Sequence, residues 1–116
     1  MSAKIERKSL SSPDETRPAG RAKAEIVNLG GFTVQRFTAQ PGWKWSTDVK
    51  PLVKTETCQL KHTGVFISGR MKVRMDDGSE IEYGPGDAYS ISPGHDGWVV
   101  GDELVVGIEW SPQQVS

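Results

Sequence analysis

The residues best suited to bind a metal ion or to catalyse a reaction are few in this chain. Cys58 is the only cysteine, and His62 and His95 are the only two histidines, among its 116 residues. Thiolate and imidazole ligands favour zinc or iron over magnesium or calcium. We therefore take Cys58, His62 and His95 as candidate metal ligands. Glu56 is the candidate fourth ligand or general base, because side chains alternate along a strand and Glu56, Cys58 and His62 have the same parity.

Each of these residues also has an ordinary structural explanation. A lone cysteine such as Cys58 often packs as a small buried hydrophobic residue. A histidine such as His62 can simply donate to a backbone carbonyl group, and His95 follows a glycine in a turn where solvent could surround it. A glutamate on a strand, such as Glu56, usually faces water.

Aromatic residues form a second candidate set. The chain has four tryptophans, which is a high number for one small domain. Such rings either fill the core of a barrel or form the wall of a pocket for a flat or sugar-like ligand. The candidate pocket residues are Trp43, Trp45, Phe66, Tyr89 and Trp98.

Short strands must position all of these side chains. Thirteen glycines and seven prolines separate segments rich in β-branched and aromatic residues, and no window shows apolar residues at helical spacing over three turns. The sequence therefore predicts an all-β fold of antiparallel strands joined by hairpins. The expected strands are 24–29, 32–39, 55–62 continuing to 68, 71–75, 80–83, 88–92, 98–100 and 103–110.

The order of turns in the second half of the chain resembles the layout of the cupin superfamily. The turns are Gly69, then Asp77-Gly78, Gly86-Asp87 and Pro93-Gly94, within a match of about 38–110. The surrounding sequence is similar to that of a small group of bacterial single-domain cupins whose biochemical role is not defined. This resemblance implies an antiparallel double-stranded β-helix, which is the cupin or jelly-roll barrel.

The resemblance also assigns positions in the first cupin motif, which has two histidines, a glutamate and a closing glycine. With Gly69 as the closing glycine, His62 takes the place of the glutamate and Cys58 that of the second histidine. Glu56 then takes the place of the first histidine. The usual ligand types of the motif are therefore replaced by others that can still bind a metal ion.

The second cupin motif departs further from the usual pattern. Its expected histidine position falls on Gly97, and the nearest imidazole is that of His95. If the loop after Gly94 has the geometry of other cupins, His95 points toward the same cavity. The resemblance thus implies that Cys58, His62 and His95 lie together.

Charge and hydropathy limit the partners and the compartment. We expect a flexible N-terminal tail over 1–23, which holds six basic and three acidic residues, and a cupin barrel domain over 24–116. Neither part has a concentrated basic face for nucleic acid or an apolar run long enough to cross a membrane. The polar start of the chain and the free thiol of Cys58 favour a cytoplasmic protein. We also expect a homodimer, because small sandwiches must cover their sheet edges and cupins commonly dimerise.

Two classes of function remain open from the sequence. The first is a metal-dependent enzyme acting on a small organic molecule as an oxygenase, isomerase or hydrolase. The second is a non-catalytic module that binds or senses a small ligand, which the missing histidine at Gly97 favours.

Overall fold

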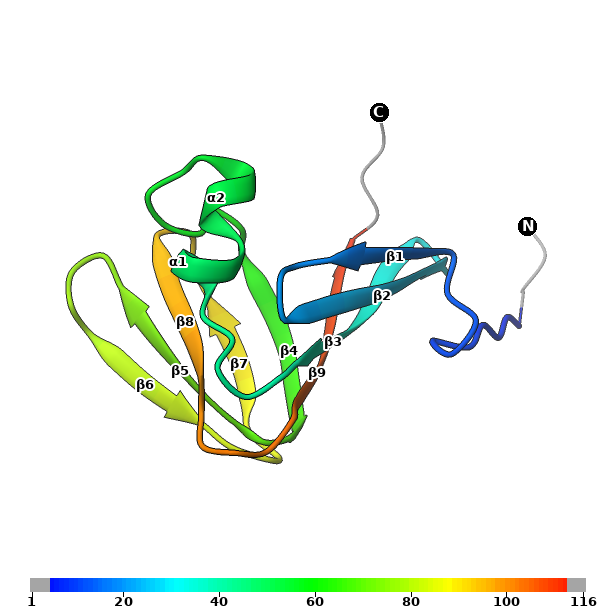
Figure 1. Cartoon of the computed structure of the whole chain (residues 1–116). Helices are drawn as coiled ribbons and strands as arrows, with labels where there is room; N and C mark the ends of the chain where they lie inside the picture. Colours follow the sequence, from blue (N-terminus) through cyan, green and yellow to red (C-terminus); the bar gives the residue numbers. More distant parts are fainter. Residues whose placement is uncertain (1–4, 113–116) are drawn as a thin grey trace.

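Two antiparallel sheets enclose the interior of the protein (Figure 1), which is described here by a computed structural model covering residues 5–112. One sheet has six strands in the order β1-β2-β3-β9-β4-β7, and the other has three in the order β6-β5-β8. The strands are β1 (Glu15–Pro18), β2 (Ala22–Leu29), β3 (Phe32–Ala39), β4 (His62–Ser68), β5 (Arg70–Met75), β6 (Glu80–Tyr83), β7 (Ala88–Ile91), β8 (His95–Val100) and β9 (Val105–Pro112).

The hairpin of β2 and β3 shows how the glycines define the turns. Leu29 pairs with Phe32, so that Gly30 and Gly31 form the whole connection. Both glycines have positive φ, at 58° and 78°, which a primed two-residue turn requires and which other residues rarely adopt. The prediction of a hairpin here is confirmed.

The sheet begins earlier in the chain than the sequence indicated. Strand β1 pairs with β2, with Glu15 opposite Ile26, and β2 starts at Ala22. The expected tail over 1–23 therefore contains one strand and the beginning of another. All four residues of β1 are exposed and polar or proline, so no hydrophobic alternation marks this strand. Backbone pairing to β2 holds it in place.

Two short helices, α1 (Trp45–Asp48) and α2 (Lys50–Val53), lie at one end of the barrel, where the sequence predicted none (Figure 1). Each has only four residues, which is too short to show a helical period. A carboxylate oxygen of Asp48 accepts the backbone N–H of Lys44 at 2.9 Å and stabilises the start of α1. Lys54, with φ of 59°, ends α2.

The strand expected over 55–62 and on to 68 is confirmed from His62 to Ser68 and is wrong before His62. β4 starts at His62, and the residues before it form a loop. Cys58 makes one isolated bridge within this loop, donating its backbone N–H to the carbonyl oxygen of His95 at 2.7 Å. This bridge, rather than a continuous strand, fixes Cys58 against the start of β8.

The core lies between the two sheets and is closed at one end by the segment that carries α1. Its buried members are Ala22, Ala39, Trp43, Trp45, Cys58, Phe66, Met71, Val73, Tyr89, Ile91, Val99 and Val105. The prediction of an all-β, antiparallel architecture is confirmed. Within residues 5–112, no helix is long and apolar enough to cross a membrane.

Candidate functional site

A cavity of about 170 Å³ lies inside the barrel. Both sheets and the segment between β3 and β4 contribute to its wall. Four of the five aromatic residues named from the sequence line it: Trp43, Trp45, Phe66 and Tyr89. Its polar side chains are Gln35, Cys58, His62, Tyr89, His95 and Glu109.

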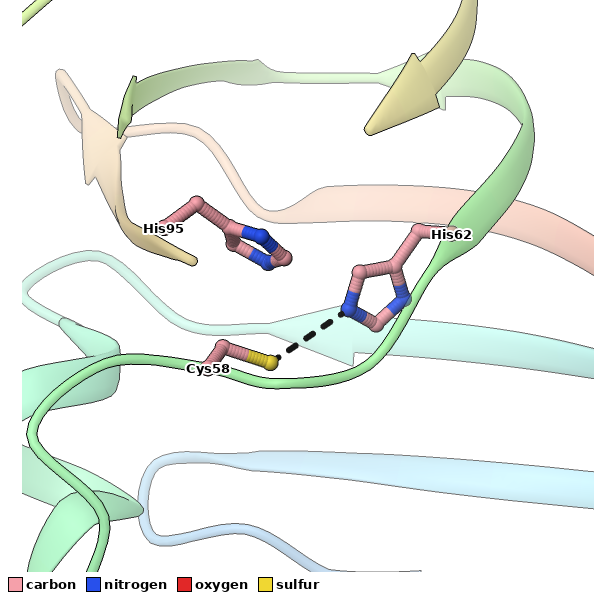
Figure 2. Close-up of side chains that lie close together, drawn as sticks. All are labelled: Cys58, His62 and His95. Atoms are coloured by element: carbon pink, nitrogen blue, oxygen red, sulfur yellow. Dashed lines mark hydrogen bonds between the residues drawn. The ribbon is translucent and has the colours of Figure 1, made fainter. Parts of the chain in front are cut away.

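Cys58, His62 and His95 lie together in the wall of this cavity. Figure 2 shows the thiol and the two imidazole rings pointing toward one another from the loop, from β4 and from β8. One candidate ligand atom from each residue lies within 4.8 Å of the others. Sγ of Cys58 is 3.6 Å from Nε2 of His62, and the two ring centroids are 5.1 Å apart.

The other ring nitrogen of each histidine already has a partner. Nδ1 of His62 is 3.0 Å from a carboxylate oxygen of Glu109, and Nδ1 of His95 is 2.7 Å from the carbonyl oxygen of Ser92. Both partners are acceptors, so each Nδ1 carries the hydrogen and donates it. Nε2 of each ring is therefore the nitrogen that could bind a metal ion, and in His62 it lies against Sγ of Cys58.

The charges of the cluster are coupled. Burial raises the pKa of the Cys58 thiol, but hydrogen bonds from His62, His95 and the Leu60 backbone outweigh burial and bring the pKa to about 6. Burial lowers the pKa of His62, but its bonds to Cys58 and Glu109 outweigh this and raise the pKa to about 10. At neutral pH the pair is therefore a thiolate and an imidazolium.

Glu109 is a central residue of the site that the sequence analysis missed. Its carboxylate accepts hydrogen bonds from His62 and Gln35 at 3.0 Å and from the hydroxyl of Tyr89 at 2.9 Å. A signal for it exists in the sequence. Glu109 has the same strand parity in β9 as the buried residues Val105 and Gly107, so a carboxylate stands where the alternation points inward.

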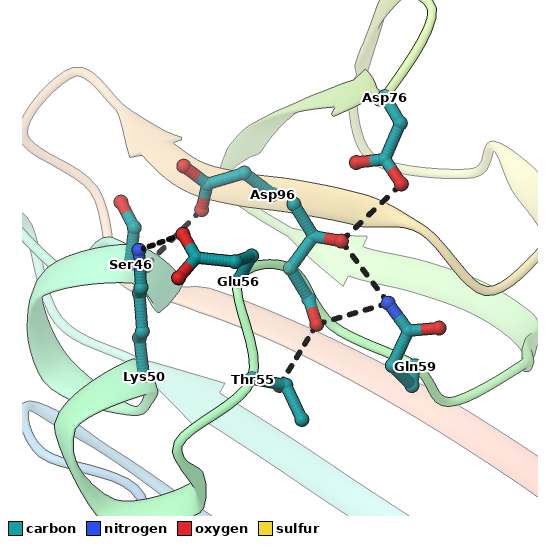
Figure 3. Close-up of polar contacts among 8 residues, drawn as sticks. Ser46, Lys50, Thr55, Glu56, Gln59, Asp76 and Asp96 are labelled. Atoms are coloured by element: carbon teal, nitrogen blue, oxygen red, sulfur yellow. Dashed lines mark hydrogen bonds and ion pairs between the residues drawn. The ribbon is translucent and has the colours of Figure 1, made fainter.

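Glu56 does not reach the cavity. Its side chain is 93% exposed and forms an ion pair with Lys50 at 2.9 Å, as Figure 3 shows. The expectation of a fourth ligand or general base at this position is therefore wrong. Strand alternation could not place Glu56 on the same face as Cys58 and His62, because the residues before His62 form a loop.

Trp98 also lies outside the cavity. Along β8, His95, Gly97 and Val99 are buried on the inner face, and Trp98 between them faces outward. The ammonium group of Lys44 sits 5.2 Å from the centre of its indole ring. The inner position next to it is Gly97, which lines the cavity without a side chain.

Comparisons with known proteins give structural matches only. No protein-family model matches the chain, and no curated protein matches it. Among solved structures, a cupin 2 conserved barrel domain protein from Salinispora arenicola CNS-205 aligns with a TM-score of 0.62 at 14% identity, over 95% of this chain and 88% of that one. This chain has the cupin fold. The prediction of a cupin barrel is confirmed.

Two further neighbours cover nearly the whole cupin barrel. The polyketide cyclase RemF from Streptomyces resistomycificus has a TM-score of 0.64 and 18% identity, over 94% of this chain and 80% of that one. A protein of unknown function from Rhizobium leguminosarum bv. viciae 3841 has a TM-score of 0.62 and 21% identity, over 92% and 97% of the two chains. At these identities the similarity concerns the fold.

Proposed function

We propose that this cupin barrel binds a divalent metal ion, zinc or iron, through Cys58, His62 and His95 and holds a small organic ligand in the adjoining cavity. The observation that carries the proposal is the convergence of the three candidate ligand atoms, within 4.8 Å of one another, in the wall of an apolar cavity.

The donor set fits such an ion. Tetrahedral zinc with bonds of about 2.3 Å to sulfur and about 2.0 Å to nitrogen separates those two ligands by about 3.5 Å. The distance from Sγ of Cys58 to Nε2 of His62 is 3.6 Å. Both histidines also donate from Nδ1 to an oxygen, which is the usual way that a metal-binding imidazole is oriented.

The chain's own residues have distinct tasks in this proposal. Glu109 and the carbonyl group of Ser92 fix the orientation of the two imidazole rings, and the aromatic wall keeps water from the organic ligand. Three protein ligands are the number found in catalytic zinc sites. A bound metal ion would supply Lewis-acid chemistry, such as polarising a carbonyl group or activating water.

A non-catalytic binding or sensor module is the second candidate. Two observations favour it: Gly97 stands where the resemblance expects a histidine, and Glu56 is too far outside to act as a base. The enzyme candidate is favoured instead by the similarity to RemF, which is named as a polyketide cyclase and is therefore an enzyme with this fold. The enzyme candidate requires the metal ion, whereas a module that binds only a small ligand does not, so metal binding is tested first.

The test is elemental analysis of protein purified without added metal, followed by zinc titration of chelator-treated protein. We expect about one metal ion per chain. Cys58→Ser and His62→Ala should lose most of the metal and still fold, with a melting temperature lowered by the loss of the ion pair and of the bound ion. Glu56→Gln, a change in the same segment but outside the cavity, is the matched control and should retain it.

Two results would contradict the proposal. One is native protein that neither contains metal nor takes up zinc. The other is a His62→Ala variant with unchanged metal content and a lowered melting temperature, which is the behaviour of a structural core histidine.

A further inference from the structure

We infer that the organic ligand of the cavity is a neutral, planar ring compound with one polar substituent. The inference deepens the proposed function by naming the ligand class of the same cavity. It depends on the cavity wall alone and not on the metal ion.

Five aromatic side chains form part of the wall, beside aliphatic ones such as Met71, Val73 and Ile91. Phe66 and Tyr89 pack with ring centroids 4.6 Å apart, and Phe37 and Trp43 pack edge to face at 5.2 Å. Together with Trp45 they line the cavity. Aromatic walls of this kind favour another flat ring, through offset stacking or edge-to-face contacts.

Two of these rings have their polar atoms engaged elsewhere. The indole N–H of Trp43 donates to the carbonyl oxygen of Ala19 at 2.8 Å, and the hydroxyl of Tyr89 donates to Glu109 at 2.9 Å. Neither donor is free to hold a ligand. The two side chains therefore offer the ligand mainly their ring surfaces.

The charge of the wall disfavours an anion. Among residues 5–112, no lysine or arginine lines the cavity, and Glu109 is its only carboxylate. The imidazole of His62 is already paired with both Glu109 and Cys58. In the metal-free protein a carboxylate ligand would therefore lose its hydration without gaining an unpaired cationic partner, which is costly in an apolar site.

The volume suits a single substituted ring. An engineered apolar cavity of about 150 Å³ in another protein binds benzene, and the cavity here measures about 170 Å³. Its remaining polar atoms belong to the cluster of Cys58, His62 and His95 and to Gln35 beside Glu109. A hydroxyl, carbonyl or carboxamide group on the ring could reach that side of the cavity.

Gly97 provides a way to block the cavity without straining the backbone. A Cβ added there would lie 3.6 Å from the carbonyl oxygen of Lys72 and 3.8 Å from Sδ of Met71, which are ordinary contacts. Since position 97 faces inward on β8, a valine would occupy cavity space. Trp98→Phe, on the outer face of the same strand, is the matched control.

The experiment uses the full chain after removal of metal with a chelator. Binding is followed by the change in tryptophan fluorescence, to which Trp43 and Trp45 in the cavity wall contribute. Benzamide and benzoate serve as a neutral and an anionic ligand of the same shape. We expect saturable binding of benzamide and at least about tenfold weaker binding of benzoate at neutral pH. Cyclohexanecarboxamide, which carries the same substituent on a non-planar ring, should also bind more weakly than benzamide.

Two variants of β8 test whether benzamide binds inside the cavity. Gly97→Val should weaken benzamide binding at least about tenfold, since the added methyl groups fill the cavity, and Trp98→Phe should leave it unchanged. If Gly97→Val does not fold, the comparison of benzamide with cyclohexanecarboxamide in native protein still decides the question of planarity.

Four outcomes would overturn the inference: no binding of benzamide, equal affinity for benzoate and benzamide, equal affinity for cyclohexanecarboxamide and benzamide, or a folded Gly97→Val variant that binds as the native protein does. Benzamide binding without any zinc uptake would contradict the proposed metal site and leave the ligand class standing. Zinc uptake without benzamide binding would contradict the ligand class and leave the proposed metal site standing.

Discussion

His62 and Glu109 face each other across the neighbouring strands β4 and β9, with Nδ1 of the imidazole 3.0 Å from Oε2 of the carboxylate. Glu109 therefore sets which nitrogen carries the hydrogen when the His62 ring is neutral, as it is when it binds a metal ion. It is itself held by Gln35 and Tyr89. The proposed metal ligand is thus oriented by a carboxylate that accepts from three side chains.

Replacing this carboxylate should weaken metal binding. Glu109→Gln removes the charge but keeps the shape of the side chain, and we expect zinc affinity to fall about 10- to 100-fold. Zinc titration of chelator-treated protein measures the change. Glu82→Gln, which alters an exposed ion pair with Arg70, is the control. Equal affinity in Glu109→Gln and native protein would show that Glu109 does not support the site.

The thiolate and imidazolium of Cys58 and His62 predict a stability plateau for metal-free protein. Cys58 has its pKa lowered from 9.0 to about 6, so its contribution is complete above pH 9 and is lost as the pH falls through 6. His62 has its pKa raised from 6.5 to about 10, so its contribution is complete below pH 6.5 and is lost as the pH rises through 10. The two pKa shifts arise from one ion pair, which is fully formed only where Cys58 is ionised and His62 is protonated. The free energy of unfolding should therefore be highest between about pH 6.5 and pH 9.

Urea denaturation in the presence of a chelator, repeated across this pH range and beyond it, measures the plateau. Cys58→Ser removes the thiolate and should flatten the dependence at both ends. A native protein whose stability does not decline on either side of the plateau would exclude the ion pair.

Two glycines near Tyr89 should respond differently to alanine. A Cβ at Gly64 would overlap the carbonyl oxygen of Ile108, whereas one at Gly107 would be 3.4 Å or more from every neighbour. We expect Gly64→Ala to lower the free energy of unfolding by about 1–3 kcal/mol or more. Gly107→Ala should stay within about 1 kcal/mol of native protein. Denaturation of the two variants side by side is the measurement, and equal losses would contradict the packing described around Tyr89.

We expect two chains to associate through the outer face of β3 and β9. Phe32 and Trp110 lie on that face and are 46% and 42% exposed. Exposed aromatic side chains are enriched at protein interfaces. Light scattering should give the mass of two chains, and Trp110→Lys should shift it toward one. A native protein with the mass of one chain at micromolar concentration would rule the dimer out.

Local signals in the sequence were enough to predict much of the fold. The Gly30-Gly31 turn needs positive φ, and a glycine pair between two strand-like segments is a local signal for such a hairpin. Strand β1 could not be predicted in this way, because its residues are all exposed and backbone pairing to β2 is what positions them.

The sequence predicted only part of the candidate site. Its reason for placing Cys58 beside His62, that both lie on one strand, is wrong. Cys58 and His62 were expected on one face of a single strand, but a loop separates them. They meet because Cys58 bridges to His95, a contact between distant parts of the chain that no local pattern encodes. The same loop carries Glu56 to the surface.

The hydrogen bond from Trp43 to the carbonyl group of Ala19 has a practical consequence for anyone preparing this protein. Ala19 lines the cavity, and it belongs to the stretch 1–23 that the sequence analysis expected to be a flexible tail. A shortened protein that starts at residue 24 would lack strand β1 and the acceptor for this indole. Even if its barrel folds, the shortened protein would have a cavity that lacks part of its wall. Binding assays on it would underestimate the affinity of the 116-residue chain for its ligands.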